Sequence, residues 1–520
     1  MDATPPAPPA PPSLPRVLGP WLAAAIVVGT VIGTGVFKKA AAVAKPDAAP
    51  EFGLSVAVWV GVGVVTLLGA LAFAEVAVRF PRAGGNYVFL REAFGRPMAF
   101  LSGWVDFGIN RGASIAALAS MFTESLANLI AEVRPDVAEG FGYWPQRAFT
   151  VGLIAVLAVI NARGTLLGAR LQFVVTLIKV ASIVAIALLP LAVLLWPGAP
   201  SQPTTANMSP AWPTEYPLAR LIGLGSAAVA VLWAYHGWMN LGPMAEEVTR
   251  PQRNIPLALL AGVGCLIVLY VSANVAYYAA LSPADMVNSS EGTTVARNFC
   301  RTLVGPAGAM AASLAVMMSV FGAVNGNILV GPRLPYAMAQ DGLAPGIFGR
   351  LHARFRTPTF ATALLAVWSI TMVLGLGVLL RTNRDLFNLW EFKEGTWRVA
   401  TDAKTGEAKT DTPFDMLTDF VIFGSVAFDT LAVVALFVLR WKHADRTAAL
   451  PYKCWGYPVV PAVYVLAMAA VMVSMFLDPE KRWKACVGLG FIGVGVLVYL
   501  LAAGRKGGRP APARLPTPPA

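Results

Sequence analysis

GTVIGTGVF, residues 29–37, places three glycines and two threonines in the middle of an otherwise apolar stretch. Glycine leaves a helix easily, and threonine hydroxyls can bond to exposed backbone groups, so this composition is typical of a helix that opens partway. A packing face of small residues is the other interpretation, since Gly29 and Gly33 have the GxxxG spacing. AYHGWMN, residues 234–240, interrupts a second apolar stretch with His, Gly and Asn.

The composition around these two stretches is that of a membrane protein. Of the 520 residues, 57% are hydrophobic and 13% are charged, whereas soluble proteins carry about 25% charged residues. A helix that crosses a bilayer needs about 20 apolar residues. Segments of that kind cover approximately residues 21–43, 54–78, 98–130, 148–160, 171–196, 218–244, 255–281, 307–337, 358–380, 416–439, 459–477 and 485–502. We therefore expect an all-α, multi-pass membrane protein with twelve transmembrane helices.

The two interrupted segments are the first and the sixth. This spacing predicts a five-plus-five inverted repeat in which each half opens on a broken helix. A half-helix that begins inside the membrane presents free N–H groups to an anion, and one that ends there presents free carbonyls to a cation. An α-amino acid carries both charges close together, so the pair of breaks favours a site for such a substrate over a packing seam.

The chain ends and one loop differ from the apolar segments. Residues 1–20 and 504–520 are rich in Pro and are predicted to be disordered tails around a transmembrane domain at 21–503. Residues 381–415 are polar and predict an external loop, with a short amphipathic turn around 386–392. Lys and Arg are enriched in the short loops that face inward when both termini are cytoplasmic. We expect that orientation in the cell membrane.

Several classes of protein are disfavoured. The four cysteines form no CxxC pair, and with three histidines the chain predicts no metal site and no cofactor. The net charge of +12 does not indicate nucleic acid, because basic residues collect in cytoplasmic loops. A membrane-embedded enzyme would need a nucleophile with a base, or an HExxH motif, and neither is present. No repeated selectivity-filter string indicates a channel.

Lys179 stands alone in the fifth span, in FVVTLIKVASIVAIALL. A charge inside the membrane is costly unless it meets a partner or loses its proton. The Lys179 side chain either snorkels to the lipid headgroups or has a role inside the helix bundle.

Other polar residues in or near the spans leave two interpretations open. Arg111, close to Asp106, is either part of an internal ion pair or marks a wide vestibule. His236 either couples protons to transport or is a buried neutral histidine bonded to backbone.

The acidic pair Glu246 and Glu247 falls at the inner end of the sixth span. These carboxylates either close a cytoplasmic gate with a basic partner or are loop charges at the membrane surface. The candidate partners are Arg79, Arg82 and Arg333.

The sequence resembles the amino acid, polyamine and organocation (APC) superfamily of transporters, and within it the L-type amino acid transporter branch. The matching strings begin with GTVIGTGVF at Gly29, PRAGGNYVFLREAFG at Pro81, WAYHGWMN at Trp233, EEVTRPQRNIPLAL at Glu246, FGAVNGN at Phe321, PRLPYAMAQDGLAP at Pro332 and, more weakly, LPYKCWGYPVVP at Leu450. The resemblance implies the inverted repeat and either sodium-independent amino acid exchange or proton-linked uptake. It also implies that Lys179 occupies the space of a coupling sodium ion.

The resemblance also assigns residues to the site. The turn that binds the substrate carboxylate falls on Val31, Ile32, Gly33, Thr34 and Gly35. The carbonyl groups that bind the amino group fall on Ile26, Val28, Gly29, Trp233 and His236. Gating and coupling fall on Lys179, Trp233, Tyr235 and Glu246.

Two departures from the family pattern concern specificity and partners. His236 stands where relatives often have a small residue. Animal L-type transporters are tethered to a heavy chain through a cysteine between spans 3 and 4, and residues 131–147 contain none. We expect no disulfide-linked partner, only the lipid bilayer and a small-molecule substrate.

The leading hypothesis is therefore a sodium-independent carrier of neutral L-amino acids that works by alternating access. The alternative is a proton-coupled importer of cationic amino acids or polyamines, which would require acidic residues at the site. The central parts of the spans offer mainly Asp106 and Asp429. This scarcity favours neutral substrates.

Overall fold

The computed structural model describes residues 14–289, 293–382, 390–393, 396–399, 413–444, 447 and 450–505. The first half of the bundle contains α1 (Pro20–Val31), α2 (Gly35–Lys38), α3 (Ala40–Val43), α4 (Phe52–Arg79), α5 (Asn86–Phe94), α6 (Arg96–Val105), a π-helical turn η1 (Asp106–Arg111), α7 (Gly112–Val133), α8 (Pro135–Ala138), α9 (Tyr143–Ala162) and α10 (Thr165–Leu194). A 3₁₀ turn η2 (Ala206–Met208) lies in the connection to the second half.

The second half contains α11 (Leu218–Tyr235), the 3₁₀ turns η3 (Trp238–Leu241) and η4 (Ala245–Glu247), α12 (Pro251–Tyr278), α13 (Pro283–Asn288), α14 (Val295–Val304), α15 (Pro306–Val330), α16 (Arg333–Gln340), the 3₁₀ turn η5 (Gly346–Gly349), α17 (Thr359–Thr382) and α18 (Pro413–Lys442). Two further long helices, α20 (Val459–Leu477) and α21 (Pro479–Arg505), follow. Strands β1 (Trp390–Lys393) and β2 (Thr396–Val399) form an antiparallel hairpin.

Eleven helical stretches among the described residues are long and apolar enough to cross a membrane. Where the ninth span is predicted, α17 carries a shorter apolar stretch, Thr359–Gly375. The all-α, multi-pass fold is confirmed, while the exact count of twelve spans stays a prediction. The third span, predicted as one helix, contains the π-helical turn η1.

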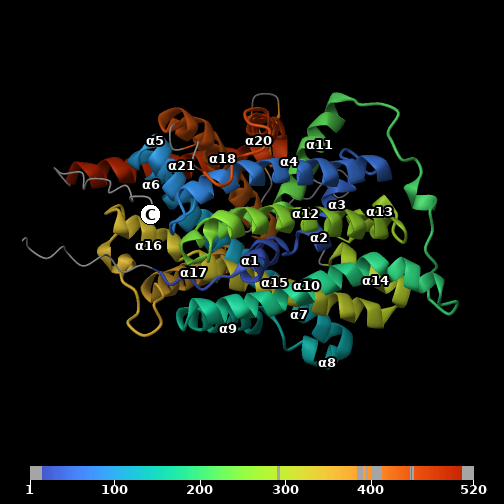
Figure 1. Ribbon diagram of the computed structural model, residues 1–520. Helices are drawn as coiled ribbons and strands as arrows, with labels where there is room; N and C mark the ends of the chain where they lie inside the picture. The colour runs from blue at the N-terminus through green and yellow to red at the C-terminus, as the bar shows by residue number, and fades with distance from the viewer. Residues whose placement is uncertain are drawn as a thin grey trace, which may run out of the picture.

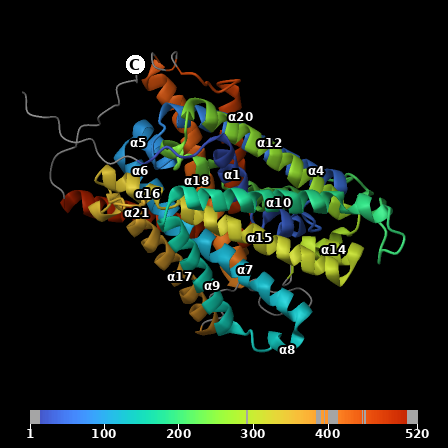
Figure 2. The same ribbon diagram turned by 60° about the horizontal axis from the view of Figure 1, so that its bottom comes forward.

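The broken first span lies at the centre of the bundle. It is the most buried of the eleven stretches, and α1 packs against α10, α12, α15 and η3. Both views show α1 between α10 and α12 (Figure 1, Figure 2). Each set of five spans begins with a broken helix, α1 followed by α2 in one set and α11 followed by η3 in the other.

Small residues make the close approach of these helices possible. A Cβ added to Gly29 would lie 2.1 Å from Thr176 Oγ1 on α10, and one added to Gly326 on α15 would lie 2.5 Å from Thr30 Cγ2. Real Cβ atoms do not approach so closely, so α1 meets both neighbours through glycine. The packing interpretation therefore holds for Gly29, even though the helix also breaks.

The chain is attached to the bundle earlier than the predicted tail boundary at residue 20. Leu14 donates its backbone N–H to Glu246 Oε1 at 2.9 Å, and Leu18 donates to Glu247 O at 2.9 Å. Both leucine side chains are buried. The rest of that predicted tail, residues 1–13, lies outside the described residues, as do residues 506–520 of the C-terminal one.

The predicted loop at 381–415 is only partly described. The amphipathic turn expected around 386–392 is not a turn where the structure describes it, because residues 390–392 belong to strand β1 and pair with β2. Alternation of Trp390 and Phe392 with Glu391 is a strand pattern that the sequence interpretation missed. Residues 386–389 lie outside the described part.

Candidate functional site

The first break lies between α1 and α2. α1 ends at Val31, Ile32 takes an extended backbone with a ψ of 96°, and α2 begins at Gly35. No hydrogen bond among the described residues uses the backbone N–H groups of Gly33, Thr34 or Gly35. Since buried N–H groups are nearly always paired in proteins, these three are available to a bound anion.

The second break lies between α11 and η3. His236 takes an extended backbone with a ψ of 146°, and Gly237 has a φ of 108°, which glycine adopts without strain. The Thr30 hydroxyl in α1 lies 3.1 Å from Gly237 O. The two broken helices therefore meet at their breaks.

Lys179 on α10 reaches the first break from the side. Its Nζ donates to Gly29 O at 2.7 Å and to Ile32 O at 2.6 Å, and the residue is 0% exposed. Ser319 on α15 adds a hydroxyl 2.9 Å from Gly33 O. The snorkelling interpretation of Lys179 is wrong, because its amino group is bonded to carbonyls that the opened helix leaves free.

A central cavity of about 370 Å³ lies between the breaks. It is lined by Thr30, Val31, Gly33, Thr34, Gly35, Ser114, Leu118, Trp233, His236, Gly237, Asn240, Ala323 and Asn327. Four of the five residues predicted to bind a carboxylate are thus at the cavity. Ile32 is the exception, since it is fully buried away from the lining and its N–H donates to Val28 O at 2.9 Å.

The residues predicted to bind an amino group are divided in the same way. Trp233 and His236 line the central cavity. Ile26, Val28 and Gly29 do not, and Gly29 O is already bonded to Lys179. The structure brings together only the helix 6 half of this predicted set.

The two aromatic residues predicted to form a gate take different places. Trp233 Nε1 donates to Thr34 Oγ1 at 3.3 Å, and the indole stacks on the His236 ring with centroids 6.3 Å apart. Tyr235 lines neither cavity, because its OH donates to Trp59 O at 3.3 Å on the far side of α11. We find Trp233 at the site and Tyr235 in the packing behind it.

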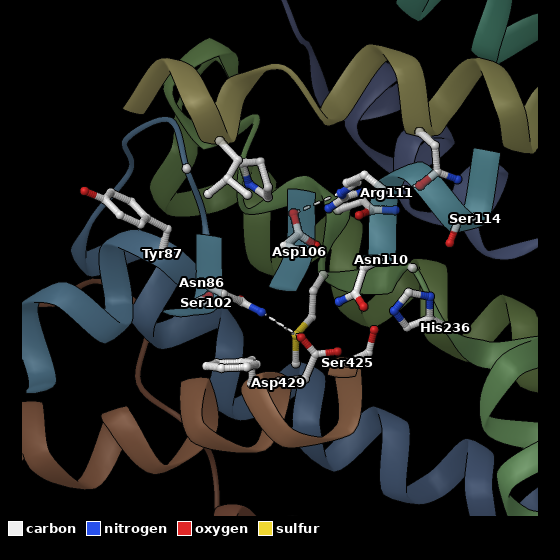
Figure 3. A pocket seen from close by; sticks show the side chains of 18 residues that line it. Asn86, Tyr87, Ser102, Asp106, Asn110, Arg111, Ser114, His236, Ser425 and Asp429 are labelled. Atoms are coloured by element: carbon white, nitrogen blue, oxygen red, sulfur yellow. Dashed lines mark hydrogen bonds and ion pairs between the residues drawn. The ribbon is translucent and has the colours of Figure 1, made fainter. Parts of the chain in front are cut away.

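A larger cavity of about 620 Å³ continues toward the end of the bundle formed by α5 and α16 (Figure 3). Both cavities are lined by Ser114, His236, Gly237, Asn240 and Asn327. The larger one adds Gly84, Asn86, Tyr87, Ser102, Asp106, Asn110, Arg111, Met239, Pro243, Leu334, Ser425, Phe428 and Asp429. His236 and its neighbours therefore stand between a central site and a wider polar space.

Both interpretations of Arg111 are correct. Arg111 Nε donates to Asp106 Oδ2 at 3.1 Å, so the two form an internal ion pair, and both residues line the larger cavity. Asp429 also lines it and accepts from Asn86 Nδ2 at 2.7 Å. Asn86 escaped the sequence interpretation, although its PRAGGNYVF string was noted, because no spacing links it to Asp429.

Tyr87 lies at the end of the larger cavity that is formed by α5. Tyr87 OH donates to Asp341 Oδ2 at 2.8 Å, and Arg91 forms an ion pair with the same carboxylate. Burial and the neighbouring Asp341 raise the pKa of the Tyr87 phenol above its ordinary value. The phenol therefore remains a hydrogen-bond donor at physiological pH.

The two carboxylates at the end of η4 have different partners, and the gating role predicted for Glu246 stays a prediction. Glu247, not Glu246, forms the buried ion pair, with Oε1 2.8 Å from Arg333 Nε. Glu246 instead accepts the backbone N–H groups of Leu14 at 2.9 Å and Ala83 at 3.1 Å. Both carboxylates join separate segments at the same end of the bundle as α5.

The opposite end of the bundle is closed over the central cavity. Val36 and Phe37 in α2 are fully buried, and Val36 O accepts from Tyr277 OH at 3.2 Å. α2 also packs against α11 and α14. Neither of the two cavities is lined by residues of α3, α13 or α14.

The fold and the pair of broken helices define a multi-pass membrane carrier, and the chain belongs to the amino acid permease family, whose profile matches residues 18–499. The serine/threonine exchanger SteT of Bacillus subtilis is 29% identical over 93% of this chain and 96% of the relative. The human cystine/glutamate transporter is 28% identical over 90% of this chain and 81% of its own length. The human large neutral amino acids transporter small subunit 2 is 26% identical over 96% and 83%.

A solved structure has the same fold. MhsT in complex with L-phenylalanine matches with a TM-score of 0.58 at 14% identity, over 89% of this chain and 99% of that one. The family and the relatives identify the chain as an amino acid transporter rather than an enzyme.

Proposed function

We propose that this chain transports neutral L-amino acids without sodium, by alternating access at the central cavity between the two breaks. The contact between Lys179 Nζ and the carbonyl oxygens of Gly29 and Ile32 carries the proposal. Those two oxygens are the kind of ligand that a sodium ion would bind. Because a side-chain nitrogen already bonds to them at 2.7 and 2.6 Å, the opened turn keeps its shape without an ion.

The lining of the central cavity supports a neutral substrate. It offers the unused N–H groups of Gly33, Thr34 and Gly35 to a carboxylate. None of the residues that line this cavity is acidic, so a cationic side chain would meet no opposite charge there. Relatives named as a serine/threonine exchanger and as a transporter of large neutral amino acids support the same class.

The difference between the two ends of the bundle supports alternating access. α2 closes the central cavity on one side, while the larger cavity extends from it on the other. We propose that the end formed by α5 and α16 is cytoplasmic, with both termini on that side of the cell membrane. We also propose that the chain works without a covalently attached partner, since residues 131–147 contain no cysteine.

Uptake by the chain reconstituted alone in proteoliposomes tests this proposal. Labelled L-serine should enter vesicles preloaded with L-serine at the same rate in sodium chloride and in choline chloride. Unlabelled L-arginine and putrescine should compete poorly. Uptake that requires sodium, or that L-arginine or putrescine blocks better than L-serine does, would contradict the proposal.

A further inference from the structure

Polar atoms without a hydrogen-bond partner gather in the larger cavity. Among the described residues, Asn86 Oδ1, Asn110 Oδ1 and Ser425 Oγ are buried and unpaired. Asn110 is 7% exposed and Ser425 is 3% exposed, and all three residues line this cavity. A buried polar atom without a partner is costly. Three such residues around one cavity could hydrogen-bond a polar ligand there once their side chains turn toward it.

Asp429 adds a carboxyl group to this set of atoms. Asn86 Nδ2 donates to Asp429 Oδ1 at 2.7 Å, which leaves Asn86 Oδ1 as an acceptor. In the described part of the chain Asp429 has no basic partner. Asp106, on the other side of the cavity, is already paired with Arg111 at 3.1 Å. Of the two acidic residues that line this cavity, Asp429 is therefore the one without an ion pair among the described residues.

Two local features place the unpaired atoms together. Ser425 and Asp429 are four residues apart on α18, so they share one face of that helix. Asn110 belongs to the π-helical turn η1, a rare geometry that often occurs at functional sites. A Cβ added to Gly424 would lie 2.9 Å from Asn110 Oδ1, so the turn touches α18 here. Figure 3 shows Ser425 and Asp429 near each other on one helix, with Asn110 and His236 beside Ser425.

We propose that Asn86, Asn110, Ser425 and Asp429 form a second, transient site for the ammonium group of the transported amino acid. This inference rests on the proposed function, because it places the site on the path from the central cavity to the end formed by α5 and α16. A primary ammonium donates three hydrogen bonds and carries one positive charge. The four residues supply a carboxylate and three unpaired oxygen atoms, which match both requirements.

Protection of a cysteine from modification tests the site directly. Ser425→Cys is nearly isosteric and points into the same cavity, so methyl methanethiosulfonate should modify it in the full-length chain. Cys265 and Cys486 are exposed and are replaced by Ala in the background. Cys300 and Cys454 are buried, and burial raises the pKa of their thiols to about 12 and about 11, so both should react slowly.

Three small probes separate the ligand chemistries. Ethylamine is L-alanine without its carboxylate, and propionate is L-alanine without its ammonium group. Ethylamine should protect the thiol of Ser425→Cys from modification, whereas propionate and sodium chloride at equal concentration should not. Adding Asp429→Asn should weaken protection by ethylamine at least about tenfold. Thr430→Val, next to Asp429 but with its hydroxyl bonded within α18 to Val426 O, should leave the protection unchanged.

Several outcomes would overturn the inference. Protection by sodium as strong as by ethylamine would show a metal-ion site, and protection by propionate would show an anion site. A thiol at Ser425→Cys that never reacts would contradict the inference, because position 425 would then face no space that a small ligand can enter. If ethylamine protects but L-serine uptake proves to require sodium, the proposed function fails and the ammonium site stands.

Discussion

Lys179→Ala removes the nitrogen that holds the opened turn of the first span. Ile32 O keeps a partner, because the Ser319 hydroxyl lies 3.3 Å away, whereas Gly29 O loses its side-chain donor. The variant therefore loses about one charge-assisted hydrogen bond that nothing replaces, worth about 1.5 to 3 kcal/mol. That energy corresponds to roughly a ten- to hundred-fold change in an equilibrium constant between the two access states.

Transport should fall by that factor, and substrate binding should weaken less. Lys179 lines neither cavity, so its removal affects binding only through the shape of the turn. Uptake of L-serine in proteoliposomes measures the first quantity and equilibrium binding of labelled L-serine measures the second. Ser182→Ala on the same helix, whose hydroxyl bonds only to Ile178 O, is the matched control. A Lys179→Ala rate within twofold of the unmodified chain, at equal incorporation, would refute this role.

Five further substitutions test the roles of the glycines, the acidic pair and Trp233. Gly33→Ala should fold normally, since the nearest atom to its Cβ is Leu118 Cδ2 at 3.5 Å, and it should weaken L-serine binding. Gly35→Ala should destabilise the chain in detergent, because its Cβ would lie 2.3 Å from Ala234 Cα. Equal unfolding temperatures for Gly33→Ala and Gly35→Ala would contradict this expected difference in stability. Glu247→Gln should destabilise the chain by about 3 to 5 kcal/mol, because it leaves the buried Arg333 without its ion-pair partner. Glu246→Gln keeps only one of the two oxygens that accept the N–H groups of Leu14 and Ala83, so it should cost less, about 1 to 3 kcal/mol. The reverse order would show that the assignment is wrong. Trp233→Phe should retain transport with a modest rise in KM, because it removes the 3.3 Å bond to Thr34 Oγ1 but keeps an aromatic ring beside His236. A complete loss of uptake would contradict this role of the ring.

The two breaks could be predicted from the sequence because glycine, threonine and histidine are conspicuous in apolar spans. A role for Lys179 inside the bundle was one of two interpretations that the sequence left open, and its position at the first break came from the resemblance. A lone amino group inside the membrane must find an acceptor, and an opened helix is where free carbonyls occur. The contacts with Gly29 O and Ile32 O agree with that reasoning.

Other contacts could not be predicted because they depend on the direction of single groups. Ile32 lies in the predicted carboxylate turn, yet its N–H continues the helix to Val28 O while its neighbours face the cavity. The choice between Glu246 and Glu247 turns on which side of a non-helical segment each carboxylate faces. Sequence spacing gives no periodicity there from which to decide.

The contacts between the polar residues that line the larger cavity could not be predicted from the sequence either. Asn86 and Asp429 are brought together by the packing of α5 against α18. Asn110 faces the cavity from a π-helical turn, where the ordinary helical periodicity does not hold. The sequence singled out Asp106, Arg111, His236 and Asp429 as polar residues in apolar spans, but not Asn86, Asn110 or Ser425.

An experimental structure of the chain with L-serine, solved in the presence of sodium chloride, tests the central claim most directly. We predict the substrate carboxylate within hydrogen-bond distance of the N–H groups of Gly33, Thr34 and Gly35, with Lys179 Nζ still bonded to Gly29 O and Ile32 O. A sodium ion bound to those two carbonyl oxygens with Nζ displaced would contradict the claim, as would an amino acid bound away from the breaks.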